Sequence, residues 1–142
     1  MTPKKIIFVC KHNVFRSRIA EGYFRKTSKN PNIQAVSRGL IMGGGSDAEQ
    51  RRISKKILGV DIAKRGPIPL NLPEMASADL IIVVANDIPR IIFDYQKIKI
   101  QAKVVIWKIP DEQMKNKKNI TRIVLEIKKK VGELNGKLEK KK

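Results

Sequence analysis

The most reactive side chain in the sequence is its only cysteine, Cys10, which is followed after five residues by Arg16 and then by Ser17. A loop of this length that enters a helix can curl so that its backbone N–H groups point at a tetrahedral oxyanion, and the helix dipole adds positive potential there. The planar guanidinium of Arg16 can hold two phosphate oxygens, which the point charge of a lysine does not reproduce. This spacing predicts a phosphate-binding loop for thiol-based phosphoryl transfer.

A cysteine at the base of such a loop should be a thiolate at neutral pH and act as a nucleophile. The Ser17 hydroxyl is suitably spaced to donate a hydrogen bond to the same sulfur. The alternative is that Cys10 is a small buried apolar side chain at the end of a strand, as many intracellular cysteines are. Because Arg16 and Ser17 follow at the required spacing, the catalytic interpretation is favoured.

Hydrolysis of a phosphate ester also needs an acid to protonate the leaving oxygen and later a base to activate water. Asp111 and Asp87 each follow a predicted strand by a few residues. Both should therefore lie at the carboxyl edge of the sheet, where Cys10 is also expected. Both are therefore candidates for the general acid. Either residue could instead be an ordinary loop carboxylate, and Asp87 could cap a helix.

The elements that position these residues follow from the hydrophobic pattern. Ile6 to Cys10 is a continuous apolar run, which is typical of a strand buried on both faces. From Arg16 onward apolar residues recur at helical spacing, and Asn30-Pro31 should stop that helix. Further strands are predicted over Ile33 to Ser37, Leu80 to Ala85 and Val104 to Trp107.

Helices and loops are predicted between and after these strands. Ser46 and Glu49 form a capping-box pattern, which predicts a helix that runs from there toward Gly59. Asp61 to Pro73 contains several prolines and is predicted to be a long surface connection, and a short helix is predicted near Asp87 to Tyr95. From Asn119 the apolar residues form one stripe of a lysine-rich amphipathic helix that should dock on the sheet.

Alternating strands and helices predict an α/β fold in which a four-stranded parallel sheet is covered on both faces, a three-layer sandwich. The length of 142 residues suits one domain over residues 1–142, ending in the lysine-rich helix and tail. With one cysteine and one histidine, we expect no intramolecular disulfide, no metal site and no cofactor. The apolar run near the N-terminus is too short for a signal peptide or a membrane span, so we expect a cytoplasmic protein without a membrane partner.

From Ile7 to Glu21 the sequence resembles the opening of the low-molecular-weight protein tyrosine phosphatases and of the arsenate reductases that share their fold. In that family the loop from cysteine to arginine lies near the N-terminus, whereas the larger tyrosine phosphatases carry it late in the chain. Weaker similarity continues to residue 111, through Ser37 to Gly39, Gly59 to Ile62, Ala78 to Ile82 and Trp107 to Asp111.

The resemblance implies a cysteine-dependent phosphomonoesterase that acts on phosphotyrosine or small aryl phosphates through a phosphocysteine. It makes Cys10 the nucleophile, Arg16 the phosphate clamp, Ser17 a stabiliser of the thiolate and Asn13 the residue that holds the strained loop. An asparagine there also tolerates left-handed backbone. Asp111 matches the catalytic aspartate that the family carries late in the chain, so the resemblance makes Asp111 the preferred general acid and Asp87 the alternative.

The partners would be a phosphorylated protein or a small phosphate ester, with inorganic phosphate or another oxyanion in the loop. The remaining loop residues that would bind substrate are Lys11, His12, Val14 and Phe15. A catalytic role for His12 is not favoured, since its side chain could simply face solvent.

Two departures from the family bear on the substrate and on the thiol chemistry. Relatives usually carry Asp-Pro followed by aromatic residues in the tyrosine-specific branch, whereas this chain has Pro110-Asp111-Glu112-Gln113. Without those rings a phosphotyrosine slot loses a stacking wall. Arsenate reduction is the main alternative, but with one cysteine it would need an external low-molecular-weight thiol. Phe15 stands where relatives often hold a second loop cysteine, so a protecting internal disulfide is excluded.

The formal net charge of +18 raises a third hypothesis, a catalytically weak anion-binding or nucleic-acid-binding protein. The segment from Lys115 to Lys142 is the most basic part of the chain. However, lysine-rich faces of docked helices are usually just solvated, and the few aromatic residues form no stacking platform. Nucleic-acid binding is therefore disfavoured. A compositional bias of the whole chain explains the lysines without a partner, and the expected consequence of the charge is steering of acidic phosphorylated substrates.

Overall fold

The computed structural model describes residues 3–94, 100–111 and 116–140. Its centre is a four-stranded parallel sheet in the order β2-β1-β3-β4. The strands are β1 (Lys5–Cys10), β2 (Gln34–Gly39), β3 (Leu80–Val83) and β4 (Lys103–Ile106). The helices are α1 (Arg16–Thr27), α2 (Ala48–Leu58), α3 (Leu72–Ser77), α4 (Ile91–Asp94) and α5 (Lys117–Lys140).

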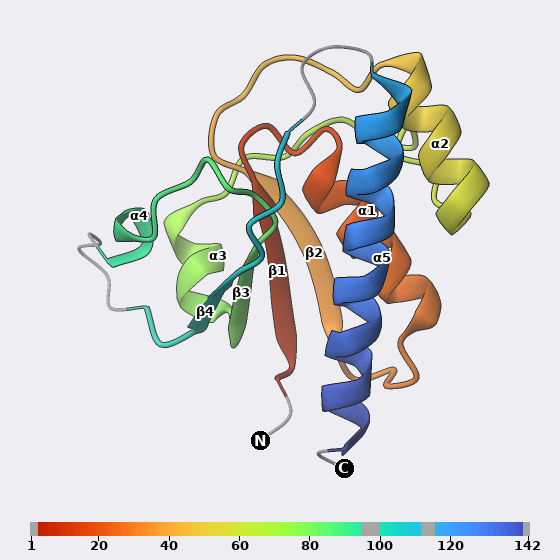
Figure 1. The fold of residues 1–142 in the computed structure, drawn as a ribbon. Coiled ribbons are helices and arrows are strands. Elements are labelled where there is room, and N and C mark those ends of the chain that lie inside the picture. Colours follow the sequence, from red (N-terminus) through yellow and green to blue (C-terminus); the bar gives the residue numbers. More distant parts are fainter. Residues whose placement is uncertain (1–2, 95–99, 112–115, 141–142) are drawn as a thin grey trace.

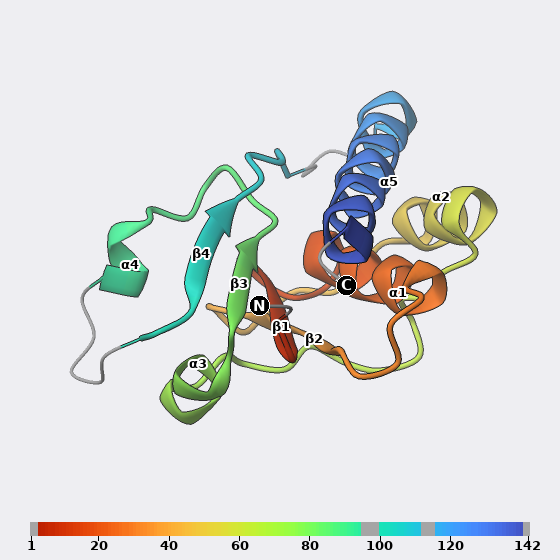
Figure 2. The ribbon, with the colours of Figure 1, turned by 90° about the horizontal axis from the view of Figure 1, so that it is seen from below.

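Helices cover both faces of the sheet. Helices α1, α2 and α5 lie on one side, and the short helices α3 and α4 lie on the other (Figures 1 and 2). Parallel strands need crossover connections, and these connections lay the helices across the faces. The predicted α/β class, with three layers and four parallel strands, is confirmed.

The central strand β1 explains why the core has two halves. Its residues from Ile6 to Cys10 are all buried, and successive side chains point to opposite faces. Ile6 and Phe8 pack into the cluster beneath α1 and α5. Ile7 and Val9 pack into the second cluster, together with Met75 of α3. In the register with β2, Cys10 lies opposite Gly39 at the carboxyl end of the strand pair.

The predicted start of α2 is wrong by one residue. Asp47 rather than Ser46 caps the helix, because its Oδ1 accepts a hydrogen bond from the Gln50 N–H at 2.8 Å. The Gln50 Oε1 accepts the reciprocal bond from the Asp47 N–H at 3.1 Å. Aspartate is as good a cap as serine, so the two patterns compete. The predicted end is confirmed, since Gly59 is the left-handed C-cap with φ 69°.

Two other boundaries differ from the sequence pattern. The connection predicted over Asp61 to Pro73 ends early, because Asn71 caps the short helix α3 and accepts a hydrogen bond from the Glu74 N–H at 2.9 Å. The helix predicted near Asp87 to Tyr95 is described only as α4, Ile91–Asp94, and Tyr95 lies outside the described residues. Pro89 lies between Asp87 and α4 and disfavours helical backbone at the residue before it.

The other predicted elements are confirmed with ends shifted by one or two residues. The last helix begins at Lys117, two residues before the predicted Asn119. Within the described part of the chain, none of the helices has the length and apolar character that a bilayer crossing requires.

The assignment of Asp47 as the cap is testable by unfolding in urea. Asp47→Ala should lower the free energy of unfolding by about 1 kcal/mol, since the backbone N–H of Gln50 loses its acceptor. The neighbouring substitution Ser46→Ala is the matched control and should cost less than half as much. Equal losses in both variants, or a larger loss for Ser46→Ala, would contradict the assignment.

Candidate active site

The predicted phosphate-binding loop joins β1 to α1 at the carboxyl end of the sheet (Figure 1). Cys10 is the last residue of β1, and Arg16 is the first residue of α1. The side chains of Cys10 and Arg16 are each 2% exposed. The loop therefore lies between two buried reactive groups that regular elements hold in place.

The Cys10 sulfur has two hydrogen-bonding neighbours from this segment. The Ser17 Oγ lies 3.0 Å from Sγ, and the Asn13 backbone N–H donates to Sγ at 3.3 Å. Ser17 is in the first turn of α1, whose N-terminus carries positive partial charge. The polar neighbours of the sulfur are therefore a hydroxyl, a backbone N–H and the N-terminal turn of a helix, all groups that can interact favourably with negative charge.

Asn13 determines the shape of the loop. Its backbone is left-handed, with φ 56°, which asparagine tolerates better than most residues. Its amide Nδ2 donates to Ser17 Oγ at 2.7 Å and to Ser37 Oγ at 3.0 Å. Its Oδ1 accepts from the Ile68 N–H at 3.0 Å and from Arg65 Nη1 at 3.3 Å. Four hydrogen bonds thus fix a side chain that is fully buried.

Three further polar side chains, those of Glu21, Ser37 and Arg65, hold Asn13 in place through hydrogen bonds. Arg65 donates to Ser37 Oγ at 2.7 Å and to Glu21 Oε1 at 2.9 Å. Ser37 in turn donates to Glu21 Oε1 at 2.5 Å. A chain of hydrogen bonds therefore connects the Cys10 sulfur, through Ser17 and Asn13, to an ion pair between Arg65 and Glu21.

Sequence reasoning did not identify Arg65, Ser37 and Glu21 as functional residues. Ser37 and Glu21 lie within segments that resemble the family, but no local pattern connects them with Arg65, which comes from the proline-rich connection. A second arginine lies near Arg65, since burial and then the charge of Arg65 lower the pKa of Arg18.

The Arg16 guanidinium contacts both candidate acids. Its Nη1 donates to Asp87 Oδ1 at 3.2 Å, and its Nη2 donates to Asp87 Oδ2 at 3.5 Å. Nη1 also donates to the carbonyl of Ile109 at 3.0 Å. Asp111 Oδ2 lies 3.8 Å from Nη2. The side chains of Asp87 and Asp111 are 33% and 26% exposed, so both reach solvent at the mouth of the loop.

The other loop residues have structural contacts. Phe15 is buried in the core beneath α1, and Val14 packs at its edge. His12 is half-buried, and its Nδ1 lies 3.0 Å from the carbonyl of Ile41, so this side chain is tied to the segment that follows β2. Lys11 is half-buried, and its carbonyl accepts hydrogen bonds from the backbone N–H groups of Leu40 and Ile41 at 3.0 and 2.9 Å.

Gly39 allows this segment to approach the loop closely. A Cβ atom at Gly39 would lie 2.8 Å from the carbonyl carbon of His12 and 2.9 Å from the Cβ of Asn13. Both are parts of the loop that cannot move without changing the contacts of Asn13. Only glycine fits at this position.

The sequence and the fold have counterparts in known proteins. The sequence matches the family model described as low molecular weight phosphotyrosine protein phosphatase over residues 5–142. The chain therefore belongs to this family of hydrolases, as the resemblance from Ile7 to Glu21 implies. Comparison of the sequence with curated proteins gives no match.

Solved structures with the same fold include enzymes of both expected types. A low molecular weight protein tyrosine phosphatase from T. tengcongensis is 23% identical, with a TM-score of 0.81 over 94% of this chain and 98% of that chain. An arsenate reductase from Archaeoglobus fulgidus is 27% identical, with a TM-score of 0.71 over 92% and 98%. The tyrosine phosphatase Wzb from Escherichia coli K30, in complex with sulphate, is 17% identical, with a TM-score of 0.77 over 96% and 99%.

The support that Arg65 gives to the loop can be measured by substitution. Arg65→Met should lower kcat for an aryl phosphate about tenfold or more and change KM little, because the Asn13 and Ser17 contacts to the sulfur loosen. Arg65→Lys should recover part of the loss. The exposed Arg52, which pairs with Glu49, offers the control Arg52→Met, which should leave both constants unchanged. A rise in KM with unchanged kcat in Arg65→Met would contradict this role.

Proposed function

We propose that the protein is a cysteine-dependent phosphomonoesterase that acts on phosphotyrosine or small aryl phosphates through a phosphocysteine intermediate. The observation that carries this proposal is the pair of hydrogen-bond contacts to the Cys10 sulfur, from Ser17 and Asn13, next to the N-terminus of α1. Membership of the phosphotyrosine phosphatase family supports the same chemistry.

In the first step the Cys10 thiolate attacks phosphorus, and the bond between phosphorus and the ester oxygen breaks. The backbone N–H groups of the loop and the Arg16 guanidinium stabilise the oxygens of the transferring phosphoryl group. The carboxylic acid of Asp111 gives its proton to the departing oxygen. In the second step water attacks the phosphocysteine, Asp111 takes the proton from water, and the bond between sulfur and phosphorus breaks to release inorganic phosphate.

Asp111 and Asp87 have different roles in this proposal. Asp87 contacts Arg16 through both carboxylate oxygens, at 3.2 and 3.5 Å. A carboxylate that contacts a guanidinium through both oxygens orients that cation, and these contacts compete with its approach to a leaving group. Asp111 approaches the same guanidinium at the longer distance of 3.8 Å. Asp111 is therefore the better general acid, and Asp87 is a positioning residue for Arg16.

The substrate is a phosphorylated protein or a small phosphate ester with an aryl group. Ile41 lies beside the loop through its hydrogen bond to Lys11, and its side chain is 52% exposed. This side chain offers an apolar surface to the ring of an aryl phosphate. Inorganic phosphate or another oxyanion occupies the loop as product or inhibitor. The thiol chemistry requires a reducing compartment, and the proposal includes a cytoplasmic location.

Arsenate reduction is the second candidate, favoured by the likeness to the arsenate reductase from Archaeoglobus fulgidus. Reduction of arsenate to arsenite takes two electrons. With Cys10 as the only cysteine, these electrons would come from Cys10 and an external low-molecular-weight thiol, which would be left as a mixed disulfide.

A paired assay separates these reactions. One arm offers p-nitrophenyl phosphate, and the other offers arsenate with glutathione as reductant. We expect turnover in the first arm, lowered about 10⁴-fold or more in Cys10→Ser, while calorimetry shows that phosphate binding is largely retained. Turnover of arsenate alone would replace the phosphatase proposal with the reductase. Phosphate binding without turnover in either arm would indicate an anion-binding protein.

The roles of the two aspartates are tested by varying the leaving group. Asp111→Asn should lower kcat about 10²-fold or more for an alkyl phosphate, which needs the proton, and much less for p-nitrophenyl phosphate. Asp87→Asn is the matched control and should slow both substrates by a similar factor, since it loosens Arg16. If Asp87→Asn showed the stronger dependence on the leaving group, the assignments would have to be exchanged.

A further inference from the structure

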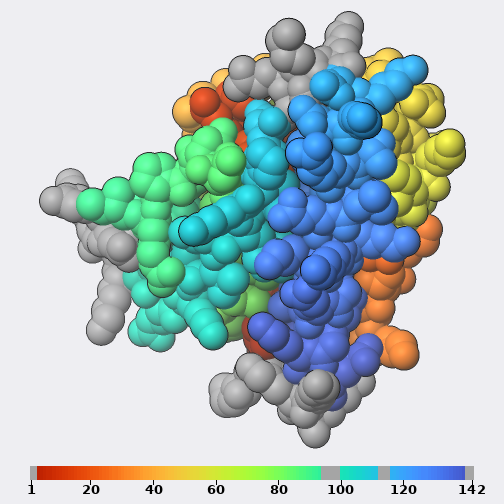
Figure 3. Space-filling view, in the orientation of Figure 1, coloured from red at the N-terminus to blue at the C-terminus, as the bar shows by residue number. Residues whose placement is uncertain are grey.

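A groove of about 580 Å³ lies between the sheet and the C-terminal half of α5, away from the cysteine loop. Figure 3 shows this face of the molecule, with β4 in cyan beside α5 in blue. The groove is left open because α5 packs against α1 and α2 rather than along β4. Val105, the β4 residue that packs against the cluster on the α5 side, is only half-buried, whereas every residue of the neighbouring strand β3 is buried.

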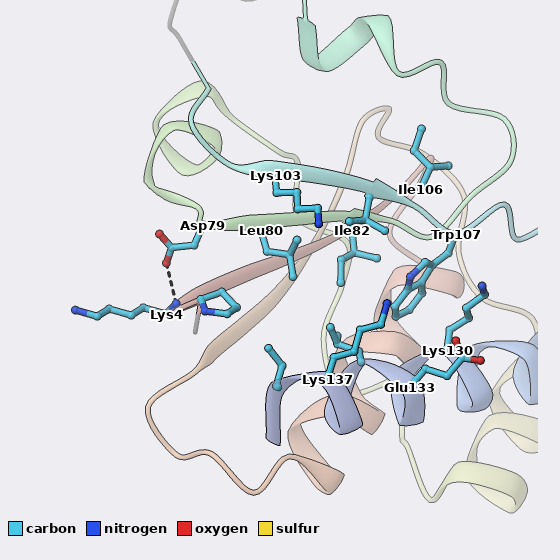
Figure 4. A pocket seen from close by; sticks show the side chains of 14 residues that line it. Lys4, Asp79, Leu80, Ile82, Lys103, Ile106, Trp107, Lys130, Glu133 and Lys137 are labelled. Carbon is cyan, nitrogen blue, oxygen red and sulfur yellow. Dashed lines mark hydrogen bonds between the residues drawn. The ribbon is translucent and has the colours of Figure 1, made fainter. Parts of the chain in front are cut away.

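The walls of the groove are apolar and come from both layers. Leu80, Ile82, Val105 and Trp107 line it from the sheet side, and Leu134 and Leu138 line it from α5 (Figure 4). The Trp107 ring is 7% exposed and packs on Phe8 with ring centroids 5.9 Å apart. A space of this size with apolar and aromatic walls is typical of a small-molecule site and is too small for a folded partner.

The charged groups at the groove are mostly basic. The side chains of Lys103 and Lys137 reach into the space between β4 and α5 (Figure 4). Within the described ranges, no carboxylate lies within 4.0 Å of either ammonium group. Of the two acidic residues in the lining, Asp79 already accepts hydrogen bonds from the backbone N–H groups of Lys4 and Lys5, at 2.8 and 2.9 Å.

We propose that this groove binds a monomeric anionic amphiphile of the fatty-carboxylate class. The alkyl chain lies along the walls formed by Val105, Trp107 and Leu134, and the carboxylate pairs with Lys103 and Lys137. Apolar walls with unneutralised cations above them match a ligand that is apolar at one end and anionic at the other. This site is separate from the oxyanion loop, since none of the residues that line it belongs to that loop.

Trp107 is the only tryptophan of the chain and therefore reports binding in its own groove. Titration with octanoate, decanoate and dodecanoate, kept below the micelle concentration, should change the fluorescence of Trp107 and saturate. Affinity should rise about fourfold for each added methylene until the groove is filled. Dodecyltrimethylammonium should bind at least about tenfold more weakly than dodecanoate, because its head group is repelled by the two lysines.

Charge reversal locates the head group. Lys103→Glu combined with Lys137→Glu should weaken dodecanoate binding about tenfold or more, and the weakening should shrink at high salt. The control is Lys128→Glu, which reverses one charge on α5 at an exposed residue outside the groove and should have little effect. Urea unfolding verifies that both variants are folded.

Several outcomes would overturn the proposal. These are the absence of a saturable signal with dodecanoate, equal binding of the cationic amphiphile, and equal weakening by Lys128→Glu. Binding only to vesicles of anionic lipid, with no response to soluble monomers, would indicate a membrane surface instead. Displacement of dodecanoate by excess inorganic phosphate would place the carboxylate in the oxyanion loop. Because the assay measures binding alone, it gives its answer whether or not the phosphatase proposal holds.

Discussion

The hydrogen bonding of one buried asparagine underlies the rest of this structure. Asn13 is held in left-handed backbone, and its amide group joins the first turn of α1, the strand β2 and the connection after α2. In a low-dielectric interior a polar group without a partner costs stability, so such a network is favourable only when it is complete. Among the described residues, every buried side-chain nitrogen and oxygen has a partner. The loop can therefore keep one shape, which is what preorganised stabilisation of an oxyanion needs.

The same reasoning explains the carboxylates around Arg16. A guanidinium that is 2% exposed must be paired, because removing one partner of a buried ion pair typically costs about 3–5 kcal/mol. Asp87 and the Ile109 carbonyl supply that pairing from the ends of β3 and β4. The sheet thus brings Asp87 and Asp111 to the edge where β1 ends in Cys10. The parallel topology allows these residues to meet, because the carboxyl ends of all the strands lie at one edge of the sheet.

Much of the fold could be predicted from the sequence, because its main signals are local. The run from Ile6 to Cys10 and the stripe along α5 are dictated by burial, and the spacing of Cys10, Arg16 and Ser17 lies within one loop and one helical turn. The cap of α2 was misplaced because Ser46 and Asp47 are adjacent and chemically equivalent as caps. The contacts of Arg65 with Asn13 and Glu21 could not be predicted, since they join residues 52 and 44 positions apart through tertiary packing. For Asp87 and Asp111 the sequence pattern predicted a place at the carboxyl edge of the sheet, but it did not predict their distances from the Arg16 guanidinium.

The stretch from Trp107 to Asp111 has a consequence for how the chain tolerates insertions and deletions. Trp107 is buried, Lys108 is exposed and Ile109 is buried again, and the carbonyl of Ile109 binds the guanidinium. Removing or adding a single residue here would reverse which groups face inward, as a shift of one residue does in any extended segment. Trp107 would stay with β4, but the Ile109 carbonyl and the Asp111 carboxylate beyond the change would be displaced from Arg16. The length of this short stretch is therefore fixed, even though most loops of similar size vary freely among related proteins.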